Sequence, residues 1–431
     1  MLKRIIGVTM ASVGIVSGAY ALDVLPHDYD YVAANQAMIA SAQAKQAMLN
    51  DSGSSNTSGG SNTSGAAIAR RVGQMMMVGF SGTEISGGSI IVQEIKNDHI
   101  GGVILFPYST TSNPNGNILN PEQLQQLTSQ LQAYAKQYND YPLFISANEE
   151  GGYINGLSPT HGFSAPYIND SALTIGNMDN PSIAYAQGKG LGTLLLANGV
   201  NMNMAPDADL CLNPNSTVIA EWHRSFGTDP NLVTTMDEQE LQGYHDAGVI
   251  AMMKHFPGLG SALQNTDLTP FVDVTSVWQK IELQPYQQVI DSPQCPPVIM
   301  VSHEINCQLD KGGYPASLSH KMVTGILRHQ LGYKGVIITD DMDAAAIYDC
   351  FTHEEATYLA VMAGDNIILY GGSLNEGPYQ AADEEELNMT TLASDMPEFM
   401  SKVNQSYQLI KALKIQMLKE ENPSGSDTVQ I

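Results

Sequence analysis

The chain has 431 residues, of which 43% are hydrophobic, and its formal net charge at pH 7 is −25. This hydrophobic fraction is enough for a substantial buried core and excludes a disordered protein. The excess of negative charge repels nucleic acid and anionic lipid, so we expect neither as a partner. The same charge suits a soluble protein that acts on a neutral substrate.

Residues 1–21 have the pattern of a secretion signal. Lys3 and Arg4 supply a positive start, residues 5–16 form a short apolar core, and residues 19–21 are Ala-Tyr-Ala, as at a cleavage site. An uncleaved membrane anchor is the alternative, but the apolar run is short for a membrane span. We therefore predict an exported protein, periplasmic or secreted, without stable membrane insertion.

The composition predicts three further regions. Residues 22–65 form an N-terminal arm, whose last part, residues 51–65, contains only Asp, Ser, Gly, Asn and Thr and is typical of a flexible linker. Residues 66–421 form one folded domain, and residues 422–431 form a polar tail. The four cysteines of this exported chain are compatible with disulfides and equally with buried free thiols.

Eight short apolar runs alternate with helical patterns along the folded domain. Continuous apolar runs, as opposed to alternating ones, are typical of strands buried on both faces in a parallel sheet. The predicted strands are Met75–Gly79, Val103–Phe106, Leu143–Ala147, Val200–Met204, Val249–Met253, Val298–Ser302, Val336–Thr339 and Asn366–Tyr370.

Two of the intervening helices have clear boundaries. Ser319 is a suitable N-cap for a helix that Gly332 ends. Apolar residues repeat every three or four positions between Phe399 and Met417, and Asp395 and Pro397 mark where that helix starts. Eight strand–helix units in this length predict a (β/α)₈ TIM barrel of the α/β class over a doubly wound sheet. The first strand–helix turn also has no dinucleotide or P-loop fingerprint.

Ionisable residues follow five of the predicted strands. Because the active site of such a barrel lies where its strands end, we expect these side chains to meet at one mouth. They are Glu149 and Glu150, Asp207 and Asp209, Lys254 and His255, His303 and Glu304, and Asp340 and Asp341.

Several carboxyl groups in one mouth suit the hydrolysis of an acetal. A retaining glycosidase needs an ionised carboxylate beneath the anomeric carbon and a proton donor for the leaving oxygen. The sequence has no Gly-x-Ser-x-Gly elbow, which disfavours a serine hydrolase of that kind. His255, His303 and Glu304 lack the His-Glu-x-x-His arrangement of a zinc site, so we expect no metal and no other cofactor.

These motifs resemble glycoside hydrolase family 3, especially its single-barrel β-N-acetylhexosaminidase branch. The resemblance extends over about residues 66–421, and its pieces occur in the family's order. They are VGQMMMVGFSGT, IGGVILF, NEEGG, NMNMAPDADL with HRSFGTDP, KHFPGLG, PASLS, LGYKGVIITDDM and AGDNIIL. KHFPGLG, residues 254–260, is the most specific of them.

The resemblance implies roles for five residues. Asp340 falls on the family's nucleophile, the first Asp of the pair after the seventh strand. Arg224, Lys254 and His255 fall on residues that hold the sugar, and Asn148 stands where the family has a sugar-binding Asp. Cations at these positions can donate to sugar hydroxyls and keep nearby carboxylates ionised.

Three further positions depart from the family's pattern. Gly156 stands at the family's second Arg, Asp267 at its acid/base His, and Asn265 at the Asp that partners this His. Glu149 does not replace the missing carboxylate of Asn148, because neighbouring strand residues face opposite ways. Burial under a closed loop would raise the pKa of Asp267 and make it a proton donor.

The sequence thus predicts an exported retaining glycoside hydrolase with Asp340 as nucleophile and Asp267 as acid/base. The resemblance implies a carbohydrate substrate, with removal of β-linked N-acetylglucosamine from peptidoglycan or chitin-type fragments. Asn148 and Gly156 leave a β-glucosidase-like activity on another pyranoside open. If Asp267 were only a capping residue, the protein would bind glycans without cleaving them.

Overall fold

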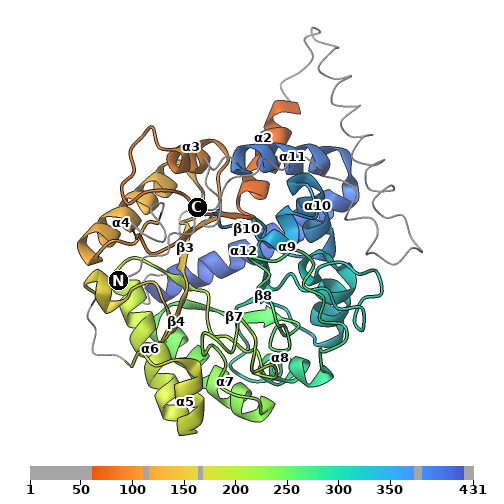
Figure 1. Cartoon of the computed structure of the whole chain (residues 1–431). Helices are drawn as coiled ribbons and strands as arrows, with labels where there is room; N and C mark the ends of the chain where they lie inside the picture. The colour runs from red at the N-terminus through yellow and green to blue at the C-terminus, as the bar shows by residue number, and fades with distance from the viewer. Residues whose placement is uncertain (1–60, 110–115, 164–167, 373–380, 422–431) are drawn as a thin grey trace, which may run out of the picture.

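A computed structural model describes residues 61–109, 116–163, 168–372 and 381–421 (Figure 1). The expected secretion signal, the arm up to residue 60 and the polar tail lie outside the described residues. The first described element is the helix α2 (Ser61–Gly73). Residues 61–65, the last part of the expected linker, lie in the first turns of this helix. Ser and Gly are poor helix formers. Ala66–Val72 continue the same helix, and Val72 is buried in the core of the domain.

The barrel predicted from the apolar runs is confirmed. Its strands close in the order β1-β2-β3-β6-β7-β8-β9-β10, β10 pairs with β1, and every neighbouring pair is parallel. The strands are β1 (Met76–Val78), β2 (Gly102–Leu105), β3 (Phe144–Ala147), β6 (Met202–Asn203), β7 (Ile250–Phe256), β8 (Val298–Val301), β9 (Val336–Asp341) and β10 (Ile367–Tyr370). Each lies within or overlaps one predicted run. A small antiparallel hairpin, β4 (Glu149–Gly151) with β5 (Ile154–Asn155), follows β3.

Helices surround the strands and complete the (β/α)₈ architecture (Figure 1). The longer ones are α3 (Ile90–Asn97), α4 (Pro121–Tyr138), α5 (Ala172–Met178), α6 (Pro181–Ala197), α7 (Pro230–Ala247), α8 (Gln284–Ile290), η4 (Lys321–Gln330), α10 (His353–Ala363), α11 (Ala381–Asp395) and α12 (Pro397–Glu421). Short turns of helix are η1 (Pro159–His161), η2 (Lys280–Leu283), η3 (Ala316–Leu318) and α9 (Ala345–Tyr348).

Helix starts follow the capping chemistry of the sequence. α4, α6 and α7 each begin with Pro after an N-cap Asn or Asp whose side chain accepts a backbone N–H of the first turn. Ser319 Oγ accepts the N–H of Met322, as predicted. The helix that follows, η4, has the wider hydrogen bonding of a π-helix, where the sequence predicted only a helix.

Burial along the barrel strands singles out two positions. All residues of the eight strands are buried except Asp340 and Asp341, the last two of β9, which are half-buried. Burial on both faces explains why the strands appear in the sequence as continuous apolar runs. The exception places two carboxyl groups at the carboxyl end of β9.

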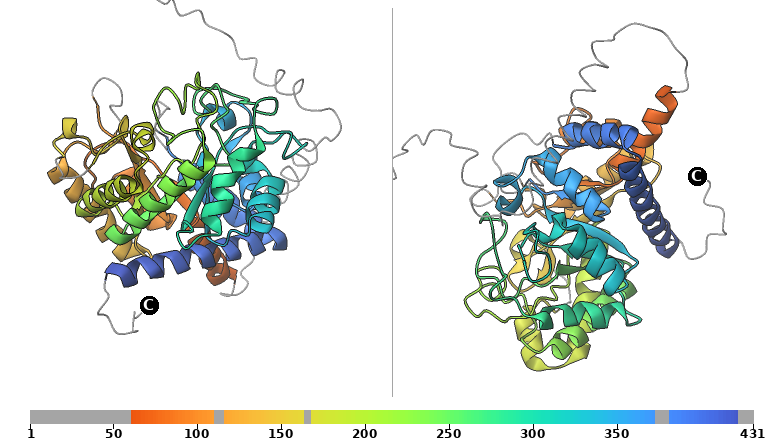
Figure 2. Two further views of the ribbon diagram at one scale, coloured as in Figure 1. Left: turned by 90° about the horizontal axis from the view of Figure 1, so that it is seen from below. Right: turned by 90° about the vertical axis from the view of Figure 1, so that its right-hand side faces the viewer.

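The last helix, α12, lies across the amino end of the barrel, on the side away from these carboxyl groups (Figures 1 and 2). It carries a fully buried lysine, Lys414, whose Nζ donates to Gln74 Oε1 at 2.8 Å and to the carbonyl of Gly101 at 2.7 Å. The ammonium also lies 4.7 Å from the centroid of the Phe144 ring. Gln74, Gly101 and Phe144 precede or begin the first three barrel strands, so Lys414 attaches α12 to the floor of the barrel.

This buried amine predicts a pH-dependent stability. Burial lowers the pKa of Lys414 from its usual value to about 7, whereas a lysine in the unfolded chain titrates near 10.4. Between these values the unfolded chain binds the extra proton, so this group's contribution to the free energy of unfolding grows with pH by up to about 1.4 kcal/mol per unit. Below pH 7 both states are protonated and the contribution is flat.

Chemical denaturation at pH 7 and pH 9 measures this effect, with Lys414→Met as the reference that lacks the amine. We expect the difference in unfolding free energy between wild type and variant to shift in favour of the wild type at pH 9. Parallel pH dependences of the two proteins would contradict the assignment.

All four cysteines lie within the described residues and are free thiols, which answers the question of pairing. Among the helices that the structure describes, none has the length and apolar character needed to cross a bilayer.

Candidate active site

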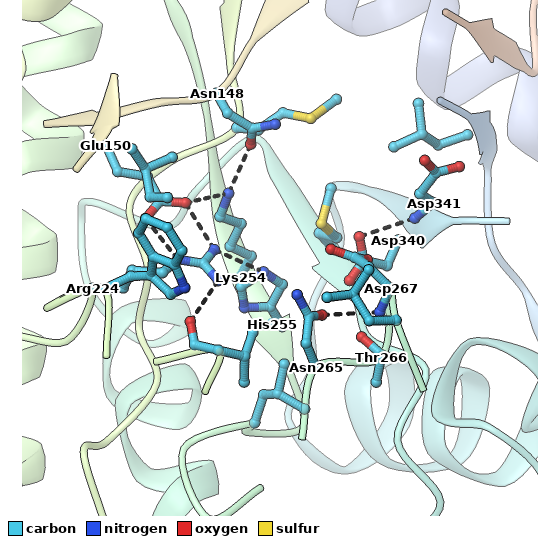
Figure 3. A pocket seen from close by; sticks show the side chains of 18 of the residues that line it. Asn148, Glu150, Arg224, Lys254, His255, Asn265, Thr266, Asp267, Asp340 and Asp341 are labelled. Carbon is cyan, nitrogen blue, oxygen red and sulfur yellow. Dashed lines mark hydrogen bonds and ion pairs between the residues drawn. The ribbon is translucent and has the colours of Figure 1, made fainter. Parts of the chain in front are cut away.

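A cavity of about 490 Å³ opens at the carboxyl ends of the barrel strands (Figure 3). It brings together the site residues predicted from the sequence, which come from separate strands and loops. Those that line it are Asn148, Arg224, Lys254, His255, Asp267 and Asp340. The prediction that Asp340 and His255 share one mouth of the barrel is confirmed. In Figure 3, Asp340 and Asp267 lie at one end, Arg224 and Glu150 at the other, and Lys254 and His255 between them.

Asp340 is placed as an ionised carboxylate. Its Oδ1 accepts the N–H of Asp341 at 2.9 Å. Burial alone would raise its pKa, but the nearby imidazoles of His255 and His303, this N–H and the Lys254 ammonium outweigh burial. The pKa of Asp340 therefore lies below the usual value for Asp, and the carboxylate is charged and available at neutral pH.

The neighbouring Asp341 is engaged with the backbone. Its Oδ1 accepts the N–H groups of Gly371 at 2.7 Å and of Asp343 at 3.0 Å. Burial and the adjacent Asp343 carboxylate raise its pKa well above the usual value. Asp341 thus joins the loops that follow β9 and β10, and of the two carboxyl groups Asp340 is the one suited to attack a substrate.

Asp267 lies on the loop after β7, and backbone hydrogen bonds attach this loop beside Asp340. The carbonyls of Thr266 and Asp267 accept the N–H groups of Ala346 and Ala345, at 3.1 and 3.0 Å, just beyond β9. The N–H of Asp267 donates to Asn265 Oδ1 at 2.9 Å. Burial, and next the charge of Asp340, raise the pKa of Asp267 to about 6. The two carboxyl groups therefore differ in pKa in the sense that an acid and a nucleophile require.

A network of charges forms the opposite end of the cavity. Arg224 makes a two-pronged contact with Glu150, from Nε to Oε2 at 2.9 Å and from Nη2 to Oε1 at 2.8 Å. Lys254 Nζ lies 2.7 Å from Glu150 Oε1 and donates to Asn148 Oδ1 at 2.9 Å. Burial would raise the pKa of Glu150, but Arg224 and Lys254 lower it to about 2. The cations are thus held in fixed positions with N–H groups near the cavity.

His255 is fixed from beneath by Asp209. Its Nδ1 lies 2.7 Å from Asp209 Oδ2, and its Nε2 lies 3.3 Å from Arg224 Nη2. Asp209 Oδ1 also accepts the N–H of Leu259 at 2.6 Å. Burial, and next the charge of Arg224, lower the pKa of His255 to about 4, so the imidazole is neutral at neutral pH. A neutral ring in a fixed orientation can hydrogen-bond a sugar hydroxyl.

Asp207, Asp209 and His255 have ligand atoms within 4.8 Å of one another, a grouping that could hold a metal ion. Arg224 Nε already lies 3.3 Å from Asp207 Oδ2 and supplies a fixed positive charge at this point. A second cation would meet that charge, so the arrangement favours the guanidinium as the partner of these carboxyl groups.

Glu304 and Asp209, which also follow predicted strands, do not line the cavity. Glu304 is fully buried, and Asp209 is bound to His255 and Leu259. The role of Glu150, which holds both sugar-site cations, was not predicted from the sequence. The sequence did contain a clue to this role. Glu150 lies two positions after Asn148, and alternation along an extended chain puts these two side chains on the same side.

Comparison with known proteins places these residues in a family. The model of the glycosyl hydrolase family 3 N-terminal domain matches residues 67–404. A β-hexosaminidase A from Pseudoalteromonas piscicida is 30% identical over 360 residues, which are 78% of this chain and 56% of that protein. A protein described as an uncharacterized secreted glycosyl hydrolase from Arthroderma benhamiae is 31% identical over 313 residues, 71% of this chain and 82% of that one. The chain thus spans little more than half the length of the Pseudoalteromonas relative.

Solved structures show the same architecture. A family 3 β-N-acetylglucosaminidase from a Paenibacillus species superposes with a TM-score of 0.70 at 28% identity, covering 84% of this chain and 64% of that one. A β-N-acetylhexosaminidase from Beutenbergia cavernae gives a TM-score of 0.69 at 28% identity, covering 80% of this chain and 98% of that one.

Proposed function

Because the chain belongs to glycosyl hydrolase family 3, we propose that it is a retaining glycosidase that removes a β-linked N-acetylglucosamine from an oligosaccharide. One observation carries the proposal: Asp340 and Asp267 line one cavity with pKa values displaced in opposite directions. The retaining mechanism uses two such carboxyl groups, one ionised as the nucleophile and one protonated as the acid. Relatives named β-hexosaminidase support the choice of sugar.

In the first step, Asp340 attacks the anomeric carbon and forms a glycosyl ester, while Asp267 gives its proton to the leaving oxygen. In the second step, the Asp267 carboxylate takes a proton from water, and the water oxygen attacks the anomeric carbon and releases Asp340. Both carboxyl groups return to their starting protonation states. No step requires a metal or an organic cofactor.

The charge network orients the sugar for this chemistry. Arg224 and Lys254 can donate to ring hydroxyls, and the neutral His255 ring can accept from one at Nε2, because Glu150 and Asp209 fix their positions. Asn148 contributes its amide nitrogen as a further donor, since its oxygen is occupied by Lys254. The site thus presents hydrogen-bond donors to a neutral carbohydrate.

We also propose that the protein works outside the cytoplasm, in a periplasm or after secretion. The support is the signal-like pattern of residues 1–21 and the description of one relative as secreted. Peptidoglycan or chitin-type fragments are the substrates that such a location offers.

A panel of nitrophenyl glycosides tests the activity, with the Asp340→Asn protein as control for contaminating hydrolases. We expect nitrophenol release from the N-acetyl-β-glucosaminide and at least about tenfold less from the β-glucoside. Preference for the glucoside would favour the other pyranosidase activity. Sugar binding by the wild type without any release would support a glycan-binding protein.

A further inference from the structure

A tryptophan remains in contact with water at the rim of the active-site cavity. Trp222 lines the cavity that holds Asp340, and 44% of its surface is exposed. Tyr153, which is 62% exposed, meets it edge to face, with ring centroids 6.4 Å apart and planes at 77°. Two large aromatic side chains exposed together beside a polar pocket indicate a binding surface.

The loop that carries Trp222 is held in place by its own hydrogen bonds. Ser216 Oγ accepts the N–H of Ile219 at 3.1 Å, and Arg224 Nη1 donates to the carbonyl of Val218 at 3.1 Å. The guanidinium that belongs to the charge network thus also fixes the loop in front of it. Trp222 is presented on a rigid support, which lowers the entropy lost when a ligand binds.

The residue after Trp222 is strained. His223 has a φ of 53°, in the left-handed region that non-glycine residues seldom adopt, and its carbonyl accepts the N–H of Leu173 at 3.2 Å. Its ring lies 5.3 Å from that of Tyr153, at 71°. Strain of this kind persists where surrounding contacts impose it, and here the contacts with Leu173 and Tyr153 hold the strained residue next to Trp222.

The rim is on the path that a longer substrate must take. The end of the cavity opposite Asp340 is closed by buried charges, since the side chains of Arg224, Glu150 and Lys254 are only 11%, 6% and 3% exposed. A sugar ring with its anomeric carbon at Asp340 would lie between Asp340 and that closed end. The rest of the substrate therefore continues outward through the mouth.

Trp222 and the Asp267 loop border the same mouth. Thr217, on the Trp222 loop, donates from its N–H and its Oγ1 to the carbonyl of Leu263, each at 3.0 Å, and Leu263 belongs to the loop that carries Asp267. These bonds place the Trp222 loop next to the Asp267 loop, so a group attached to the oxygen that Asp267 protonates would pass close to both loops as it leaves.

We propose that Trp222, positioned by Tyr153, is the stacking platform for a second pyranose ring, on the leaving-group side of the bond that is cleaved. The axial C–H groups of a β-linked pyranose form an apolar face that packs on an indole ring, while its hydroxyls remain in water. This inference rests on the proposed function and identifies the residue that binds the second sugar ring of its oligosaccharide substrate.

The test compares one-ring and two-ring substrates that both have poor leaving groups, methyl β-N-acetylglucosaminide and chitobiose. Trp222→Ala should lower kcat/KM for chitobiose about tenfold and change that for the methyl glycoside less than about twofold. Trp222→Phe should restore most of the loss. Tyr348→Ala is the matched control, because Tyr348 is 55% exposed and does not line the cavity.

Equal losses on both substrates would mean that Trp222 only supports the Arg224 loop, and no loss on chitobiose would also overturn the proposal. Calorimetry on the Asp340→Asn protein separates this result from the proposed activity. There Trp222→Ala should weaken binding of chitobiose but not of N-acetylglucosamine, whether or not the wild type turns either substrate over. Unchanged chitobiose affinity would again reject the stacking role.

Discussion

Asp340→Asn should reduce turnover by about 10⁴-fold or more while sugar binding is retained. The amide has the same shape as the carboxylate. Its oxygen can still accept the hydrogen bond from the Asp341 N–H that Oδ1 of Asp340 accepts in the wild type. It cannot form the glycosyl ester, because a neutral amide is a poor nucleophile. The measurements are kcat on a nitrophenyl glycoside and the affinity for the free sugar by calorimetry.

Asp341→Asn is the control for this variant. Asp341 Oδ1 accepts N–H groups from Gly371 and Asp343, and an amide oxygen can do the same, so we expect a much smaller loss. A fluorinated sugar that traps the ester should label the wild type at Asp340. A label on Asp341, or equal losses in the two variants, would reassign the nucleophile.

The barrel could be predicted from the sequence because both faces of each strand are buried. Burial on both faces produces continuous apolar runs, and the ionisable residues that interrupt them fall where strands end. Asp340, Lys254 and His255 could therefore be assigned to one mouth of the barrel from the amino-acid order alone. The linker boundary was less certain, because a helix end with Ser and Gly, as in residues 61–65, has the composition of a loop.

The hydrogen-bond partners within the site could not be predicted. Glu149 and Glu150 are adjacent and chemically alike, yet Glu149 is buried away from the cavity with its pKa raised to about 8, whereas Glu150 binds Arg224 and Lys254. Alternation along the chain places Glu150 on the side of Asn148, but the partners of its carboxylate, Arg224 and Lys254, come from distant segments that no periodicity in the sequence brings together. Trp222 was missed for a related reason, since its exposure depends on the fold of a loop.

The position of Asp267 supports the riskier assignment made from the sequence. A lone Asp in a loop is usually a cap or a solvated charge. Here the loop is bound to the chain just after β9, and the side chain lies in the cavity beside Asp340. Burial and that neighbour raise its pKa to about 6, so a fraction of Asp267 carries its proton at neutral pH.

Asp267→Ala should therefore slow hydrolysis of chitobiose by about 10²–10⁴-fold, the range expected for loss of a general acid and base. For nitrophenyl glycosides the rate of the first step should fall far less, because their leaving groups need little protonation. The variant keeps the backbone carbonyl that accepts the N–H of Ala345, so the loop should remain in place. Equal losses on the two kinds of substrate would indicate a damaged loop and not a missing acid.

The pH dependence gives an independent test of the same residue. The first step needs Asp267 protonated, so kcat/KM of the wild type on chitobiose should fall as the pH rises above about 6. In Asp267→Ala this fall in kcat/KM above about pH 6 should disappear.

Azide rescue tests the role of Asp267 in the second step. That step needs Asp267 ionised to activate water, whereas azide needs no base, so added azide should restore turnover of the variant on nitrophenyl glycosides. The product should be a β-glycosyl azide, because azide attacks from the face opposite the Asp340 ester. A variant that keeps the wild-type pH limb and yields no azide product would show that the proton comes from another group.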